Sequence, residues 1–268
     1  MNNSCRLGLL AAIFASTVGY SSISSAQDGR FSNIGVAAGG YATFSPVYEG
    51  SDDYKVRGVP IIYPTFGNGN GEESRLYFRG IDDIRYAVFR NSGLNVGPLV
   101  GYRFGRDVGD AAELGGLGNP DGGLVVGGFA QYGYGGAFAD VAASKQVSGL
   151  SNSGFLVKFG AGYDFDISAR LSSRIYASGT YASEEYMDQY FTISAAQAAA
   201  SVAGYAAYNA GAGIKNVNLS ASVKYEATEN LSLRARLGYS RILGDAANSP
   251  ITINDNQYSG GVGLIFKF

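Results

Sequence analysis

The sequence has no histidine and only one cysteine, and this limits the chemistry that the protein can perform. Histidine is the usual proton-transfer base near neutral pH because its pKa lies at about 6.5. Histidine and cysteine also supply most ligands for transition metals. Cys5 lies at the N-terminus, so the rest of the chain has neither a disulfide nor a thiolate. We therefore expect no enzyme activity, no metal and no cofactor.

The sequence also lacks an excess of charge of either sign. Its formal net charge is −2 at pH 7, and charged residues make up 16% of the chain. A balance so close to neutral gives no electrostatic reason to bind nucleic acid. Acidic pairs such as Asp52-Asp53 and Glu184-Glu185 are interpreted as solvated loop carboxylates. A site for a hard cation at one of these pairs is the alternative.

Long apolar runs are absent except at the N-terminus. Residues 7–20 form an apolar run of about 14 residues after Arg6, and small residues lead to Ala26. This pattern predicts a secretory signal peptide, residues 1–26, cleaved after Ala26. The alternative is a membrane anchor, but a spanning helix needs about 20 apolar residues. After Tyr20 no stretch approaches about 18 such residues, which excludes ordinary helical spans.

Alternation of apolar with small or charged residues is the main pattern of the remaining chain, residues 27–268. The segments 155–165 and 258–268 show it most clearly. Successive strand side chains point to opposite faces, so each segment has one apolar face and one small or charged face. The pattern predicts about twelve strands, at 33–44, 54–64, 73–80, 82–90, 94–105, 123–134, 136–147, 154–165, 171–182, 215–226, 231–241 and 257–268.

The lengths of the connections indicate how these strands are arranged. Long connections at 45–53, 106–122, 183–214 and 242–256 all follow odd-numbered strands, whereas connections after even-numbered strands are short. Long extracellular loops and short periplasmic turns are typical of outer-membrane barrels. We therefore predict an all-β fold, a closed antiparallel transmembrane β-barrel in the outer membrane of a Gram-negative bacterium, in contact with its lipid. A soluble β-sandwich is the alternative, but it would carry more charge than this chain.

Particular residues lead to further structural expectations. Pro60 and Pro98 lack a backbone donor, so we expect a bulge or a strand end at each. Aromatic residues near strand ends, among them Tyr63 and Tyr132, predict girdles at the two membrane interfaces.

Most of the charged residues at the predicted inward positions of the strands are basic. The acids among them are chiefly Asp83, Asp140 and Asp164. Such a wall could form an anion-preferring pore, or its side chains and loop acids could fill the lumen through ion pairs. The predicted basic face consists of Arg85, Arg103, Lys158, Arg174, Lys224, Arg234 and Arg236.

The last strand ends in a row of apolar residues that should face lipid. This row resembles the element by which barrel-insertion machinery recognises its clients, so we expect that machinery to be a partner. The row contains Tyr258, Val262, Leu264, Phe266 and Phe268.

Several segments resemble, in order, the MltA-interacting protein family, MipA/OmpV. They include Pro46-Val47-Tyr48-Glu49-Gly50-Ser51-Asp52 and residues 97–107, 114–118, 186–191, 240–251 and 263–268. Within the long loop 183–214, the alanine-rich residues 195–200 look helical, which departs from the family pattern. The resemblance implies an outer-membrane scaffold that bridges a murein-degrading lytic transglycosylase and a murein-synthesising penicillin-binding protein. Other members are described as antigens, adhesins or stress-linked proteins, and no catalytic residue of the family carries over.

Three functions follow from these observations. Scaffolding of cell-wall enzymes is the leading hypothesis. A narrow porin-like channel with a basic, anion-preferring lumen is the second, and an adhesin that uses loops 183–214 and 242–256 is the third.

Overall fold

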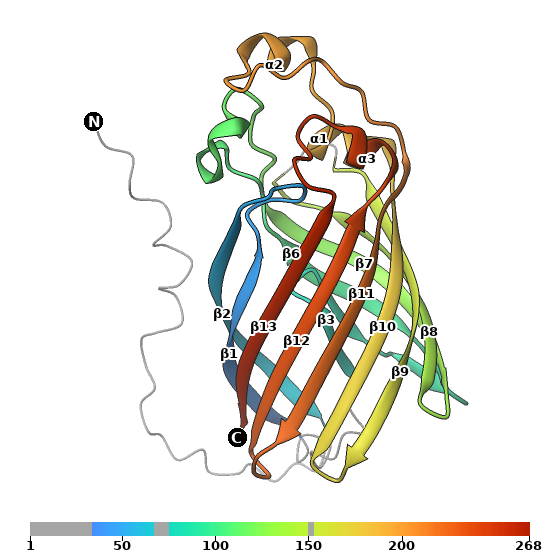
Figure 1. Ribbon diagram of the computed structural model, residues 1–268. Coiled ribbons are helices and arrows are strands. Elements are labelled where there is room, and N and C mark those ends of the chain that lie inside the picture. Colours follow the sequence, from blue (N-terminus) through green and yellow to red (C-terminus); the bar gives the residue numbers. More distant parts are fainter. Residues whose placement is uncertain (1–33, 67–74, 150–152) are drawn as a thin grey trace. The chain divides into compact units, whose positions relative to one another are not determined.

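The computed structural model describes residues 34–66, 75–149 and 153–268 (Figure 1). The predicted signal peptide, residues 1–26, lies outside this range. Within these residues, no helix has the length and apolar character needed to cross a membrane.

The described strands form one antiparallel sheet in which neighbours in sequence are neighbours in space. The first and last strands also pair, with Ala42 opposite Val262, so the sheet curls into a barrel. The strands are β1 (Ile34–Pro46), β2 (Tyr54–Phe66), β3 (Leu76–Gly80), β4 (Asp83–Tyr86), β5 (Phe89–Asn91), β6 (Leu94–Arg103), β7 (Gly123–Tyr134), β8 (Ala137–Gln146), β9 (Phe155–Ser168), β10 (Leu171–Ala182), β11 (Gly213–Glu226), β12 (Leu231–Ile242) and β13 (Asn256–Lys267). Because β4 and β5 are two parts of one predicted strand, the prediction of an all-β barrel with about twelve strands is confirmed.

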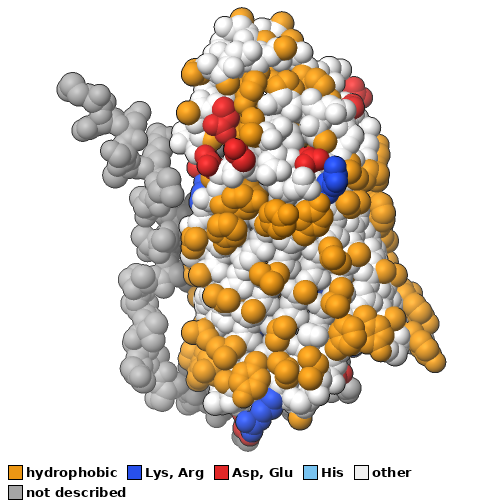
Figure 2. Space-filling view, viewed as in Figure 1, with side chains coloured by type: hydrophobic (Ala, Val, Ile, Leu, Met, Phe, Trp, Pro, Cys, Tyr) orange, Lys and Arg blue, Asp and Glu red, His pale blue; other side chains and the backbone are white. Residues whose placement is uncertain are grey.

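The outer face of the barrel is apolar. In β13 the side chains of Val262 and Leu264 are 62% and 54% exposed, whereas Ile265 between Leu264 and Phe266 is 1% exposed and faces inward. On the face shown in Figure 2, apolar side chains are spread over the barrel wall, while charged side chains lie near its two ends. Such a belt would be unfavourable in water, but it matches hydrocarbon, where paired strands leave few backbone groups unsatisfied.

The two ends of the strand ladder are β2 and β3, and no backbone pairing joins them in the described part of the chain. Instead, the rings of Tyr63 and Phe78 meet with their centroids 4.6 Å apart. Tyr63 is half-buried between the exposed residues Ile62 and Pro64, so it lies on the inner face of β2. The prediction that Tyr63 is a girdle residue is therefore wrong, because this ring packs against β3 where the ladder ends.

The two prolines behave differently. Arg85 pairs with Leu99 but Phe89 pairs with Val96, so one extra residue separates β4 from β5 opposite Pro98, and the expected bulge is present there. Pro60 pairs in regular register with Gly40, so a bulge or strand end at Pro60 was a wrong expectation. β2 has only one ladder neighbour, and proline is tolerated on such an edge strand because part of its backbone makes no ladder bond.

The predicted long loops are present and lie together at one end of the barrel, where they carry the helices (Figure 1). We call residues 47–53, 104–122, 183–212 and 243–255 the cap. Its helical segments are η1 (Val108–Asp110), η2 (Ala112–Leu114), α1 (Glu184–Tyr190), α2 (Ala195–Ala200) and α3 (Gly244–Asn248).

Helix α2 corresponds to the alanine-rich segment that looked helical. It begins with a capping box. Ser194 Oγ accepts a bond of 3.2 Å from the Gln197 backbone, and Gln197 Oε1 accepts one of 2.8 Å from the Ser194 backbone. These two bonds satisfy backbone donors that a short helix otherwise leaves free.

Two buried clusters hold the cap together. One lies beside the ends of β9, β10 and β12 and contains Leu156, Ala182, Tyr186, Met187, Tyr190, Phe191, Ala210, Ile242 and Ala246. The other joins four loops and contains Tyr48, Ala111, Leu114, Leu117, Ile193 and Ile251. The cap is therefore packed around apolar cores of its own.

Candidate functional site in the lumen

A buried arginine ties together strands on the inner wall at mid-barrel. Arg85 of β4 is fully buried, and its Nε and Nη2 donate to Asp83 over 2.6 and 2.8 Å. Its Nη1 donates to Asp140 of β8, and its guanidinium lies 5.3 Å from the ring centre of Phe129 on β7. A buried charge is tolerated only when it is paired and hydrogen-bonded, and Arg85 meets that condition with two carboxylates.

A second group of cations surrounds an aromatic pair next to Arg85. The guanidinium of Arg79 lies 4.8 Å from the ring centre of Phe138 and 5.3 Å from that of Tyr176. Arg174 lies 4.8 Å from the same Phe138 ring. Arg236 of β12 donates to the backbone oxygen of Arg79 on β3 over 2.6 Å, although these strands are not ladder neighbours. Side chains from different parts of the wall therefore meet inside the barrel. We call this set the mid-barrel cluster: Arg79, Asp83, Arg85, Phe138, Asp140, Arg174, Tyr176 and Arg236.

Of the seven residues of the predicted basic face, Arg85, Arg174 and Arg236 belong to the mid-barrel cluster. Several are close to a carboxylate. Arg174 Nη2 lies 2.7 Å from Asp164 Oδ2, and Lys158 Nζ lies 4.0 Å from Asp83. Lys224 Nζ lies 2.5 Å from Glu226. These contacts favour the hypothesis of a lumen filled through ion pairs over that of an open basic wall.

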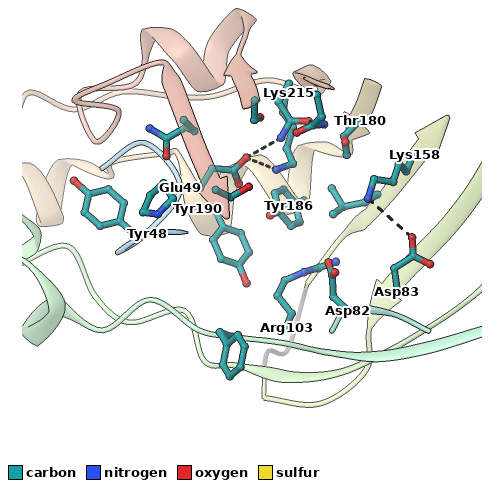
Figure 3. Close-up of a pocket in the computed structure, with 18 of the residues that line it drawn as sticks. Tyr48, Glu49, Asp82, Asp83, Arg103, Lys158, Thr180, Tyr186, Tyr190 and Lys215 are labelled. Atoms are coloured by element: carbon teal, nitrogen blue, oxygen red, sulfur yellow. Dashed lines mark hydrogen bonds and ion pairs between the residues drawn. The ribbon is translucent and has the colours of Figure 1, made fainter. Parts of the chain in front are cut away.

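A cavity of about 460 Å³ lies in the lumen beside the cap (Figure 3). Glu49, from the loop after β1, reaches into it and accepts hydrogen bonds from Lys215 and from Asn216 Nδ2, the latter over 3.0 Å. Carboxylates from the loops can therefore neutralise lumen cations, as the hypothesis of a lumen filled through ion pairs requires. Arg103 is the only residue of the predicted basic face besides Lys158 that lines this cavity, within the described chain.

Alternation along the strand could not identify Lys215. Thr180 pairs with Asn216 while Tyr181 pairs with Ile214, so Lys215 is the extra residue of a bulge in β11. Strict alternation would place Lys215 on the lipid side with Val217, but the bulge turns it inward, where it is buried. The bulge leaves no clear signal in the sequence.

Aromatic residues of α1 form one wall of the cavity. The stacked rings of Tyr186 and Tyr190 have centroids 4.6 Å apart. The Arg103 guanidinium and the Lys215 ammonium each lie 5.3 Å from the Tyr186 ring centre, so this ring faces two cations. Burial raises the pKa of both tyrosine hydroxyls well above the usual value, which keeps them neutral.

Arg106 contacts the C-terminal end of helix α1. Its Nη1 donates to the backbone oxygen of Tyr190 over 2.7 Å, and burial lowers the pKa of its guanidinium. Across residues 34–66, 75–149 and 153–268, no group of three or more acidic or cysteine side chains is arranged to hold a metal ion. The hard-cation alternative at the acidic loop pairs therefore has no geometric support in this range.

The C-terminal row lies on the lipid side of β13. Phe266 and Phe268 are 42% and 75% exposed, and their ring centroids are 4.9 Å apart. The backbone N–H of Phe268 donates to Val36 of β1 over 2.8 Å. The last residue is therefore tied to the first strand and presents its ring to the bilayer.

Comparison with known proteins gives one match to a protein family and several to solved structures. The family model described as MltA-interacting protein MipA matches residues 38–268. No curated protein matches the chain.

Among solved structures, the chain is similar to the NanC porin, with 10% identity over 87% of this chain and 100% of that chain and a TM-score of 0.44. It is similar to OmpT of Vibrio cholerae, with 8% identity over 88% of this chain and 97% of that chain and a TM-score of 0.36. An anion-selective porin from Comamonas acidovorans shows 13% identity over 88% of this chain and 98% of that chain, with a TM-score of 0.31.

Proposed function

The chain belongs to the MltA-interacting protein family, MipA, and we propose that its outer-membrane β-barrel is a non-enzymatic scaffold for murein enzymes. The name of the family refers to an interaction with MltA, a lytic transglycosylase. A lytic transglycosylase is therefore the first partner to test, and a penicillin-binding protein is the second.

The observation that carries this proposal is the mid-barrel cluster. Arg85 is fully buried and holds Asp83 and Asp140, and Arg236 bonds to the backbone of Arg79 on a distant strand. Side chains that bridge the lumen stiffen the wall and narrow the passage. A stiff, narrow barrel suits a protein that works through its surfaces better than one that conducts solutes.

The surface available to a murein enzyme is the short-turn end of the barrel, which faces the periplasm in outer-membrane barrels. Among the described residues, this end carries charged side chains that are exposed in the turns, including Arg170 between β9 and β10 and Glu229 between β11 and β12. The cap lies at the other end and would face the outside.

An affinity column that carries the mature protein in detergent tests this proposal. We expect it to retain the transglycosylase from an envelope extract. The double variant Arg170→Glu, Glu229→Lys keeps the net charge but exchanges the charges at the short-turn end, and we expect at least a fivefold loss of retention.

The matched control is the charge reversal Asp52→Lys, because Asp52 is exposed in the cap. Equal loss with Asp52→Lys would place the partner at the wrong end of the barrel. Failure to retain any murein enzyme would remove the scaffold role.

The porin-like channel is tested separately in planar bilayers. A lumen bridged by the mid-barrel cluster predicts little or no conductance, and large single-channel steps would contradict the scaffold proposal. An anion-preferring pore would instead conduct and change its selectivity when Arg234 and Arg236 are replaced by glutamate.

The adhesin hypothesis assigns function to the long loops. Leu114 and Ile193 of these loops are almost completely buried within the cap, so much of their apolar surface is already used. The adhesin hypothesis predicts that deletion of loops 183–214 and 242–256 abolishes host binding. This result would favour the adhesin if the native protein also retained no murein enzyme.

A further inference from the structure

The cavity beside the cap has more basic than acidic side chains around it. Three acidic residues line it, and two of them are already engaged: Glu49 binds Lys215 and Asn216, and Asp83 binds Arg85. The third, Asp82, is exposed to solvent. Five basic residues line the same cavity, namely Arg57, Arg103, Arg106, Lys158 and Lys215. The cavity therefore has unneutralised positive charge.

Arg103 is the clearest unpaired cation in this cavity. It is 9% exposed, and its Nη2 has no hydrogen-bond partner. Within the described chain Arg103 forms no ion pair, and its guanidinium lies over the Tyr186 ring, 5.3 Å from the ring centre. A buried guanidinium without a counter-charge is costly, because it gives up water without gaining a partner.

The hydroxyl of Tyr190 is a second donor without a partner. Tyr190 is 9% exposed, and its hydroxyl group is buried and makes no hydrogen bond in the described structure. Figure 3 shows the hydroxyl end of Tyr190 pointing toward the part of the cavity where Arg103 lies. Both residues line the same cavity, and an N–H donor and an O–H donor without partners can each be satisfied by an oxygen acceptor.

Size and access also fit a small ligand. A volume of about 460 Å³ lies within the usual range of small-molecule sites, roughly 300–1,000 Å³. Ser259 lines the cavity and is exposed, and the side chain of Lys158 is 32% exposed. Solutes can therefore approach from the lumen side. The ring of Tyr186 supplies a flat apolar surface next to the unpaired cation.

We propose that this cavity binds a small solute through a carboxylate or phosphate group, held by the guanidinium of Arg103 and the hydroxyl of Tyr190. The oxyanion accepts from both donors and compensates the buried charge, and the rest of the solute packs against Tyr186. This site is independent of the scaffold role, which depends on the short-turn end.

Isothermal titration calorimetry of the mature protein in a zwitterionic detergent tests the site. The probes are inorganic phosphate, glucuronate and glucose, because glucuronate and glucose are similar sugars that differ in the carboxylate. We expect phosphate or glucuronate to bind and glucose not to bind. Binding of one anion but not the other identifies the class of solute.

Variants connect the signal to the cavity. Arg103→Gln should weaken anion binding at least tenfold, and Arg103→Lys should have an intermediate effect because it keeps the charge but loses the planar donor pair. Tyr190→Phe should weaken binding about threefold, by loss of one neutral hydrogen bond. The matched control is Arg90→Gln, since Arg90 is exposed on β5 away from the cavity.

Folding of each variant is checked by heat-modifiable migration on gels, and Tyr190→Phe keeps the test valid if Arg103→Gln does not fold. Binding of neither anion to the native protein overturns the proposal. Native-like affinity in Arg103→Gln, or in both Arg103→Lys and Tyr190→Phe, also overturns it.

Discussion

The barrel wall and the cap place their apolar side chains in opposite directions. On the wall, Leu237 is 71% exposed toward lipid, and the inner positions carry charged and small residues. In the cap, Leu114 is fully buried among residues from other loops. Apart from the pairing of β1 with β13, the wall is built from strands that are neighbours in sequence, whereas the cap joins segments such as Tyr48 and Ile251 that are 203 positions apart.

This difference follows from the solvent that each region meets. Lipid is as apolar as leucine, so apolar side chains can face it, and the polar groups of the wall turn inward and pair. The cap lies in water and is stabilised by apolar burial, as a soluble domain is. The chain therefore combines a lipid-facing wall with a cap that has its own apolar core and lies in water. Substitutions in the wall and in the cap should have different effects.

The largest expected effect is on the lipid-facing C-terminal row. Replacing Phe266 and Phe268 with aspartate places charges in hydrocarbon and removes the aromatic terminus, so we expect the barrel not to assemble. Heat-modifiable protein in the outer-membrane fraction should disappear, while export continues.

The control for this pair is Ile253→Asp, because Ile253 is 46% exposed in the cap and faces water. Ile253→Asp should assemble normally. Normal assembly of the Phe266/Phe268 variant would show that the row is not needed and would count against the wall interpretation.

The same substitution made in the two regions compares them directly. Leu114→Ala should lower the free energy of opening the cap by about 2–5 kcal/mol, the usual cost of a cavity in a packed core. Leu237→Ala on the wall should change stability little, because lipid fills the space. Limited proteolysis of the cap loops measures the first effect, and thermal unfolding of the barrel measures the second. Equal losses of stability from Leu114→Ala and Leu237→Ala would contradict the proposed difference between the cap and the wall.

The inner face of the wall should respond to loss of charge. Asp140→Asn removes one of the two carboxylates that hold Arg85, and we expect the barrel to lose about 1–3 kcal/mol of stability. Asp83 still pairs with Arg85, which limits the loss. Asp166→Asn, at an exposed position of β9, is the matched control and should change nothing measurable in calorimetry.

The smallest effect is a loosening of the cap at alkaline pH. Burial raises the pKa of Tyr48, Tyr186 and Tyr190 above the usual 10.0. When the cap opens these hydroxyls return to ordinary values and lose protons above pH 10.0, so the stability of the closed cap falls as pH rises and is unchanged below that value.

Proteolysis of the cap should therefore accelerate as the pH rises above about 10, while the strands remain protected. Tyr48→Phe should reduce this pH dependence, since one titrating hydroxyl is removed. A proteolysis rate independent of pH would contradict the prediction.

Much of the wall could be predicted from sequence because a two-residue period and turn lengths are local properties. These two properties predict the number of strands, the outward direction of Val262 and Leu264, and the inward direction of Arg174. Local rules fail where the chain departs from regular alternation. They misplaced Tyr63, which packs on β3 where the ladder ends, and they could not identify Lys215, which a bulge turns inward.

The candidate site was only partly accessible from the sequence. Arg103 lies on a regular strand and was predicted to face the lumen, and the structure places it there. Its partners Tyr186 and Tyr190 come from a helix in a long loop, and no periodicity connects that helix with β6. Glu49 reaches the lumen from yet another loop.

The sequence by itself determined that the chain is an antiparallel membrane barrel with long loops at one end, because alternation and turn length are properties of neighbouring residues. Only the tertiary structure decided how the lumen is filled and which loops meet to form the cap. Arg85 with Asp140, and Tyr48 with Ile251, are brought together by the curling of the sheet. No local sequence pattern predicts these contacts, because contacts between distant residues depend on the whole fold.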